Sequence, residues 1–205
     1  MTENAAAREG ERRAEVARAT KETQITVAVD LDGAGTARID TPVPFFNHML
    51  DAFTRHSLLD LEVEAEGDVD VDDHHTVEDV GIVMGDAVRR ALGSKAGIRR
   101  FGQAVVPMDE ALVLCALDIS GRGQAFVDVP FQTATVGSFD TQLVKEFFLA
   151  FAREAGITLH VRMLAGENSH HVAEACFKAC GRALRAAVER DPRVTGVPST
   201  KGSLQ

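Results

Sequence analysis

HHTVEDV (residues 74–80) and HHVAEAC (170–176) are two versions of one motif, and their repetition decides the fold. The two copies lie 96 residues apart in the chain. Working outward from them, two further pairs of similar segments occur in the same order: HMLDAFTR (48–55) with EFFLAFAR (146–153), and VDLDGAG (29–35) with ALDISGRG (116–123). Three matches in one order indicate an internal duplication, although two repeats are too few for a solenoid.

Hydrophobic periodicity predicts the same order of elements in both halves. In the first half we expect strands over 25–31, 36–40 and 59–65 and helices over 45–56 and 72–93. In the second half we expect strands over 110–120, 124–129 and 157–163 and helices over 141–156 and 169–189.

These elements predict an α+β fold built from two duplicated α/β half-domains, each a small sheet with helices on one face. A pseudo-two-fold axis would relate the halves, with the helices packed together between the sheets. We expect one compact domain in four segments: a mobile N-terminal tail (1–20), a first half-repeat (21–105), a second half-repeat (106–192) and a flexible C-terminal tail (193–205).

Composition excludes several classes of function. The chain has 205 residues and a net charge of −9, which argues against sequence-independent nucleic-acid binding because that requires an excess of Lys and Arg. No apolar run is long enough for a transmembrane helix, and the first residues lack a signal-peptide pattern, so we expect no membrane partner. The three cysteines form no CxxC pair, which favours a reducing cytoplasm.

Four of the seven histidines form two H-H-x-x-E motifs, His74-His75-x-x-Glu78 and its copy in the second half. On a helix, positions i and i+4 share a face, so His74 converges with Glu78, and His170 converges with Glu174. The neighbouring His75 and His171 point about 100° away and are free to serve a second centre. Imidazole combined with carboxylate is typical of a site for a divalent transition metal.

The duplication pairs His48 with Glu146, because the two occupy matching repeat positions. Exchanging the halves then yields two equivalent ligand sets, one of His48, His75, His170 and Glu174 and the other of Glu146, His171, His74 and Glu78. We therefore predict two metal sites per chain, each drawing ligands from both halves. Four protein ligands leave two open positions on an octahedral ion such as Mn²⁺, as a catalytic site requires.

Simpler interpretations compete for individual residues. One H-H-x-x-E motif could be a solvated helix start, but two copies at matching positions argue against this. His160 lies at an outward position of a strand and is expected to be structural. Cys176 and Cys180 are expected to pack rather than to bind metal. Glu146 could be an ordinary surface residue, and only its equivalence to His48 makes it a ligand candidate.

Together the motifs resemble the imidazoleglycerol-phosphate dehydratase family. The resemblance runs from about residue 18 to the C-terminus, and the paired H-H-x-x-E motifs with a PSTKG tail are specific to that family. The seven segments that carry the resemblance are RATKET (18–23), FFNHMLDAFTRH (45–56), GDVDVDDHHTVED (67–79), GIRRFG (97–102), LDISGRG (117–123), AGENSHHVAEACFKACGRALR (165–185) and PSTKG (198–202).

The resemblance implies a metal-dependent hydro-lyase of histidine biosynthesis, a carbon–oxygen lyase that converts imidazole glycerol phosphate into imidazole acetol phosphate. It also implies two Mn²⁺ per chain, bridged by the imidazolate form of the substrate. Glu22 is the first candidate for the base, and Glu78 and Glu174 are the alternatives. The residues implied to bind the phosphorylated imidazole substrate are Glu22, His48, His56, His74, His75, Arg100, Arg122, His170, His171, Lys178, Ser199 and Lys201.

The family forms a large homo-oligomer, a 24-mer of octahedral symmetry whose active sites are completed by neighbouring subunits. This chain departs from the family pattern at Glu146, where many members have His, and at Ala52, where some have Gln beside the substrate. Two other functions compete: a dinuclear metallohydrolase acting on a phosphorylated small molecule, and a metal sensor or store. A sensor would leave Arg100, Arg122 and Lys178 without a shared purpose.

Overall fold

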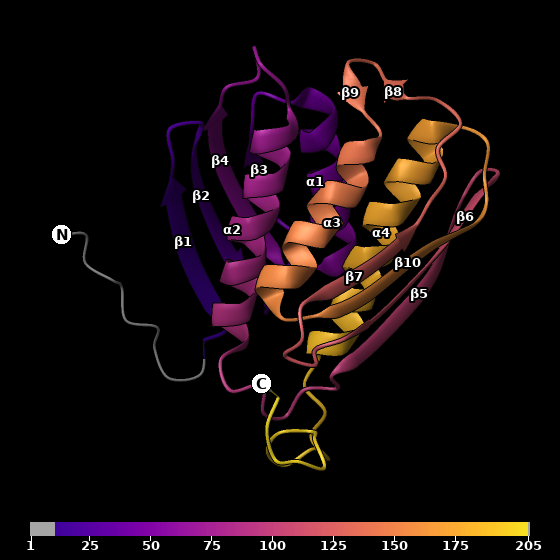
Figure 1. The fold of residues 1–205 in the computed structure, drawn as a ribbon. Coiled ribbons are helices and arrows are strands. Elements are labelled where there is room, and N and C mark those ends of the chain that lie inside the picture. Colours follow the sequence, from indigo (N-terminus) through magenta and orange to yellow (C-terminus); the bar gives the residue numbers. More distant parts are fainter. Residues whose placement is uncertain (1–10, 205) are drawn as a thin grey trace.

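A computed structural model describes residues 11–204 of the chain. Two four-stranded sheets form the outer layers, and four long helices fill the space between them (Figure 1). This arrangement confirms the predicted α+β fold with its helices between the sheets. Within the described residues, no helix is long and apolar enough to cross a membrane.

The first sheet has the strand order β1-β2-β4-β3, in which β1, β2 and β4 pair antiparallel and β3 joins β4 in parallel. The elements of this half are β1 (Arg13–Ala19), β2 (Thr23–Asp30), β3 (Ala37–Asp40), α1 (Pro44–Ser57), β4 (Asp60–Gly67) and α2 (His74–Leu92).

The second sheet repeats this topology as β5-β6-β10-β7, again with two antiparallel pairings and a final parallel one. A short hairpin of two strands is added before the third helix. The elements are β5 (Phe101–Met108), β6 (Ala111–Asp118), β7 (Gln124–Asp128), β8 (Thr135–Val136), β9 (Phe139–Asp140), α3 (Gln142–Ala155), β10 (Thr158–Ala165) and α4 (Ser169–Val188).

The helices of the two halves interlock, because α1 packs on α4 and α2 packs on α3. Glycines allow both close approaches. A Cβ at Gly85 of α2 would lie 2.6 Å from the carbonyl oxygen of Phe151, and one at Gly181 of α4 would lie 2.5 Å from that of Phe53. These two contacts occupy matching repeat positions. Each helix pair therefore combines one helix from each half. Such a pairing is needed if each ligand set is to draw residues from both halves.

Phenylalanines fill the centre of the helical layer. Phe147 lies 5.4 Å from Phe46, 5.2 Å from Phe148 and 5.2 Å from Phe177 between ring centroids, and all four side chains are buried. Aromatic rings bury large apolar areas and prefer such edge-on or offset contacts. This cluster joins α1, α3 and α4, the helices that carry His48, Glu146 and His170.

Two of the predicted segment boundaries are wrong, and both lie at edge strands. Residues 13–19, assigned to a mobile tail, form β1, and the predicted boundary at 105/106 falls inside β5. Both are edge strands, which tolerate charged side chains and proline because one side of the backbone needs no partner. The charges of β1 and Pro107 of β5 therefore masked their strand character. The first ten residues of the predicted tail lie outside the described residues.

Candidate metal centre

Three of the predicted ligands meet where α1 packs against α4. The Nε2 atoms of His48 and His170 each lie 3.2 Å from Oε2 of Glu174. One ligand atom from each of the three residues falls within 4.8 Å of the others. His48 comes from the first half of the chain and the other two from the second, so the duplication brings the histidine motif and its partner together.

The start of α4 fixes its two histidines. Asn168 is the N-cap, and its side-chain oxygen accepts hydrogen bonds from the backbone N–H groups of His170 (2.9 Å) and His171 (3.3 Å). An N-cap of this type stabilises the first helical turn. Phe45 of α1 packs edge-on against His170 with 5.2 Å between ring centroids, and its ring is tilted against that of Phe139 in the β8–β9 hairpin, 5.1 Å away.

Glu174 is nearly buried but remains an anion. Burial opposes its ionisation, yet the hydrogen bond and charge of Lys178 and the proximity of His48 outweigh that effect, so the pKa of Glu174 lies below its ordinary value. Lys178 Nζ lies 2.7 Å from Oε1, while Oε2 faces the two histidines. One oxygen is thus held by lysine and the other is directed at the cluster.

The equivalent position between α2 and α3 is less complete. His74 Nε2 lies 3.7 Å from Oε2 of Glu78. The other oxygen of Glu78 lies 3.8 Å from the guanidinium of Arg153 on α3. Glu146 is half-buried on α3, but within residues 11–204 the only group of three or more ligand residues is the one on α1 and α4.

His75 and His171, the second histidines of the two motifs, contact carboxylates through Nδ1. Both oxygens of Asp68 lie 3.1 Å from Nδ1 of His75, and Oε2 of Glu110 lies 2.8 Å from Nδ1 of His171. These hydrogen bonds raise the pKa of each histidine. The hydrogen bond from His171, with help from the backbone N–H of Asn168, lowers the pKa of Glu110 to about 2. Sequence analysis did not identify either carboxylate.

Glu22, the predicted base, lies in the turn between β1 and β2. Its carbonyl oxygen accepts a hydrogen bond from the backbone N–H of Asp68 at 3.1 Å, which ties this turn to the loop before α2. The negative charge of Glu22 contributes to the raised pKa of His75, after the larger effect of Asp68. Glu22 therefore belongs to the surroundings of His75 within one chain.

The comparisons with known proteins decide the family. The model of the imidazoleglycerol-phosphate dehydratase family matches residues 41–184, most of the chain. The chain belongs to the imidazoleglycerol-phosphate dehydratase family. Its members are dehydratases, or hydro-lyases, of histidine biosynthesis, and the predicted family and activity class are confirmed.

Individual relatives match almost end to end. The imidazoleglycerol-phosphate dehydratase of Desulforamulus reducens is 58% identical over 193 residues, which cover 94% of this chain and 98% of the relative. That of Granulibacter bethesdensis is 58% identical over 194 residues, covering 94% and 99%. Among solved structures, the dehydratase of Staphylococcus aureus has a TM-score of 0.80 at 39% identity and covers 87% of this chain and 99% of its own. That of Pyrococcus furiosus has a TM-score of 0.80 at 40% identity, covering 92% and 100%.

The residues that the dehydratase family implies for phosphate binding lie in two places. Arg100 forms a two-pronged ion pair with Asp118, with N···O distances of 2.7 and 3.0 Å, and donates a further hydrogen bond to the carbonyl of Pro198 at 2.9 Å. That contact holds the C-terminal segment that carries Ser199 and Lys201. Arg122 is exposed in the turn before β7.

Lys178 lies elsewhere, on α4 beside Glu174. His56 is half-buried near the end of α1, and burial, followed by the charges of Lys178 and Arg182, lowers its pKa. One chain thus gathers Arg100 with the PSTKG segment and places Lys178 and His56 on the helix pair that carries the metal candidates.

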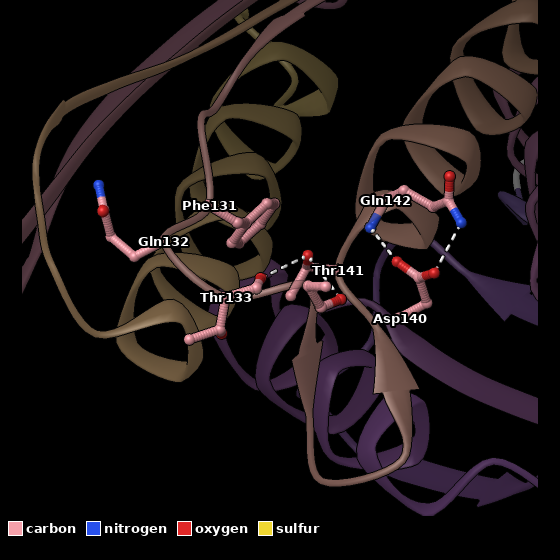
Figure 2. Close-up of a pocket in the computed structure, with 7 residues that line it drawn as sticks. Phe131, Gln132, Thr133, Asp140, Thr141 and Gln142 are labelled. Atoms are coloured by element: carbon pink, nitrogen blue, oxygen red, sulfur yellow. Dashed lines mark hydrogen bonds between the residues drawn. The ribbon is translucent and has the colours of Figure 1, made fainter.

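A shallow depression beside the β8–β9 hairpin is a separate feature (Figure 2). Its lining residues already pair among themselves. Thr141 donates its hydroxyl to the carbonyls of Thr133 and Ala134 at 3.0 Å, and Asp140 accepts from the backbone and side chain of Gln142. These bonds fix the hairpin that presents Phe139 to Phe45, and none of the residues that line the depression is a predicted ligand.

Proposed function

We propose that this chain eliminates water from imidazole glycerol phosphate to give imidazole acetol phosphate, and that it does so with two Mn²⁺ per chain. The convergence of His48, His170 and Glu174 across α1 and α4, in a member of this dehydratase family, carries the proposal. The same family membership favours this reaction over a metallohydrolase or a metal sensor.

The donor set fits a transition metal. Neighbouring ligands on an octahedral ion lie about 3 Å apart when each bond is about 2.1 Å long. The 3.2 Å distances from Glu174 Oε2 to both histidine Nε2 atoms match that spacing. Two imidazoles with one carboxylate indicate a divalent transition metal, the class that includes Mn²⁺, rather than Ca²⁺ or Mg²⁺, which prefer oxygen ligands alone.

Each centre needs ligands from more than one copy of the chain. In the first set, His75 would complete the group of His48, His170 and Glu174 from a second copy. In the second set, His171 of another copy would join His74, Glu78 and Glu146. This partition follows from the incomplete groups within one chain, and it requires a homo-oligomer, for which we propose the octahedral 24-mer of the family.

The outer surfaces of the two sheets support assembly. Along β4 of the first sheet the exposed side chains are glutamates, whereas four apolar side chains of the second sheet are each more than half exposed: Phe101, Val105, Phe126 and Leu164. Strand alternation directs Phe101 away from α4, because its neighbour Gly102 faces that helix. An apolar sheet face of this kind is typical of a surface covered by another subunit.

The reaction breaks two bonds of the substrate. The C–O bond beside the imidazole ring breaks and its hydroxyl leaves as water, and the neighbouring carbinol C–H loses its proton to give an enol that tautomerises to the ketone. When bound, the metals would act as Lewis acids that favour loss of the imidazole N–H proton. We assign proton removal to Glu22, beside His75, with Glu78 and Glu174 as alternatives.

The chain supplies separate groups for the phosphate. Arg100, Arg122, Ser199 and Lys201 offer charged and neutral donors, and guanidinium groups are well suited to a phosphate dianion. Lys178 would neutralise Glu174 and the anionic substrate at the metal side. The three free cysteines are typical of a reducing compartment, so we place the reaction in the cytoplasm.

A metal-removal assay tests the proposal. The full-length protein is stripped with a chelator and then assayed for dehydration of imidazole glycerol phosphate with and without added Mn²⁺, while bound metal is counted in the same samples. We expect activity to return as about two ions per chain bind. Full metal loading without dehydration would reject the proposed reaction.

A further inference from the structure

We propose that Asp68 and Glu110 are positioning residues that orient His75 and His171 so that each presents Nε2 to a metal ion. This inference rests on the metal-dependent function proposed above. It concerns residues outside the two ligand sets, since neither carboxylate belongs to the histidine motifs or meets the group formed by His48, His170 and Glu174.

The contacts define which nitrogen carries hydrogen. A carboxylate can only accept hydrogen bonds, so the Nδ1 atoms held by Asp68 at 3.1 Å and by Glu110 at 2.8 Å must be the donors. In a neutral imidazole the lone pair then lies on Nε2. His48 and His170 also direct Nε2 inward, toward Glu174. These two histidines therefore direct Nε2 at the candidate metal position, the same nitrogen that the carboxylates leave free on His75 and His171.

The two carboxylates come from different places in the two halves. Asp68 lies in the connection between β4 and α2, whereas Glu110 lies in the turn between β5 and β6 and reaches the histidine from another segment. Duplication alone would have placed them at matching positions. The same contact built from unrelated loops indicates that the orientation of each histidine is itself required.

Glu110 is held in place from the other side. Its Oε1 accepts the backbone N–H of Asn168 at 2.8 Å and that of Glu167 at 3.3 Å, which leaves Oε2 for His171. The N-cap of α4 and the ligand histidine are thus tied to one carboxylate. Nε2 of His171 has a second carboxylate 3.7 Å away, on the exposed side chain of Asp109, which is beyond hydrogen-bonding distance.

A carboxylate on the far nitrogen makes a histidine ligand more basic and limits rotation of its ring, and removing such a partner weakens metal affinity by about 10- to 100-fold. The variants Asp68→Ala and Glu110→Ala remove the contact, and Asp68→Asn and Glu110→Gln keep the shape without the charge. Two exposed acids serve as controls: Asp70→Asn in the same loop as Asp68, and Glu167→Gln in the connection between β10 and α4, whose backbone contacts Glu110.

Mn²⁺ is titrated into each chelator-stripped, full-length variant, and the Mn²⁺ concentration for half-maximal dehydration is measured in parallel. We expect each alanine variant to lose about 10- to 100-fold in affinity at one class of site, the isosteric variants to lose less, and saturating Mn²⁺ to restore most of kcat. The controls should match the parent protein, and circular dichroism confirms that each variant is folded.

Three results would overturn the assignment. Affinities of the folded alanine variants within twofold of the parent would do so while leaving the proposed function intact. Equal losses in the two controls would attribute the effect to net charge rather than to the histidine contacts. A parent protein that binds no Mn²⁺ would remove both this inference and the proposed function.

Discussion

The two helix pairs share one backbone frame but differ in readiness to bind metal. Between α1 and α4, Glu174 faces two histidines, and its second oxygen is held by Lys178 one turn later. Between α2 and α3, the residue that matches Lys178 is Ile82, and Arg153 of the other helix approaches Glu78 instead. Duplication has preserved the frame while the side chains diverged. We infer that three ligands of the first centre are already preorganised within one chain, whereas the ligands of the second centre come together only in the assembly.

Loss of the Glu174 carboxylate is expected to have the largest effect on the difference between the two helix pairs. Glu174→Gln removes the charge that faces both histidines, and we expect dehydration to fall by more than about 100-fold, since even indirect contacts to a ligand are worth 10- to 100-fold. Bound Mn²⁺ should fall from two ions per chain to one. The exposed Glu167→Gln is the control, and a variant of Glu174 that keeps both ions and full activity would contradict the assignment.

Gly85 and Gly181, which occupy matching repeat positions, test whether the two helix crossings are equivalent. Alanine at Gly181 or Gly85 brings a Cβ within 2.5 or 2.6 Å of a backbone carbonyl oxygen, so the helices must separate. We expect each substitution to cost about 1–3 kcal/mol and to lower the thermal midpoint to a similar extent. Exposed Ser94→Ala should change nothing. An effect confined to one glycine would show that the two helix crossings are not equivalent.

Each half of the chain also has an arginine–aspartate ion pair at its sheet, and the two pairs differ in what else they contact. Arg100 binds Asp118 in the second half, and Arg13 binds Asp30 in the first at 2.7 Å. Only the Arg100–Asp118 pair also holds the C-terminal segment. Asp118→Asn should therefore raise KM about tenfold with kcat nearly unchanged, because one charge-assisted hydrogen bond is worth a change of about that size. Asp30→Asn should leave KM unchanged. Equal KM values for both variants would show that Asp118 does not contribute to substrate binding.

The smallest effect is expected from making the two centres alike. Glu146→His gives the second centre the same residue types as the first and the residue found in many family members. We expect Mn²⁺ affinity at the weaker site to rise by about tenfold or less, because the second centre would then have the donor set of the first, and imidazole is a common metal ligand. Titration of the stripped protein measures the change, and a lower affinity at that site would show that Glu146 is the better ligand here.

Periodicity and repetition predicted most of the fold and the core of the candidate site. The i,i+4 spacing of His170 and Glu174 predicts that they share a helix face, and the repeat brings His48 to them. The edge strands β1 and β5 were missed because an edge need not alternate between apolar and polar residues. Asp68 and Glu110 were missed because loop paths, which carry no periodic signal, bring them to their histidines. The pairing of Arg100 with Asp118 was missed for the same reason.

The most direct measurement of the central claim is a Mn²⁺ titration of the chelator-stripped, full-length protein, with dehydration of imidazole glycerol phosphate followed in the same samples. Two ions per chain should bind with unequal affinities, and activity should appear only as the weaker site fills. Glu174→Gln should remove the tighter ion, and Glu78→Gln the weaker. Binding of a single ion per chain with full activity would contradict a pair of duplicated centres.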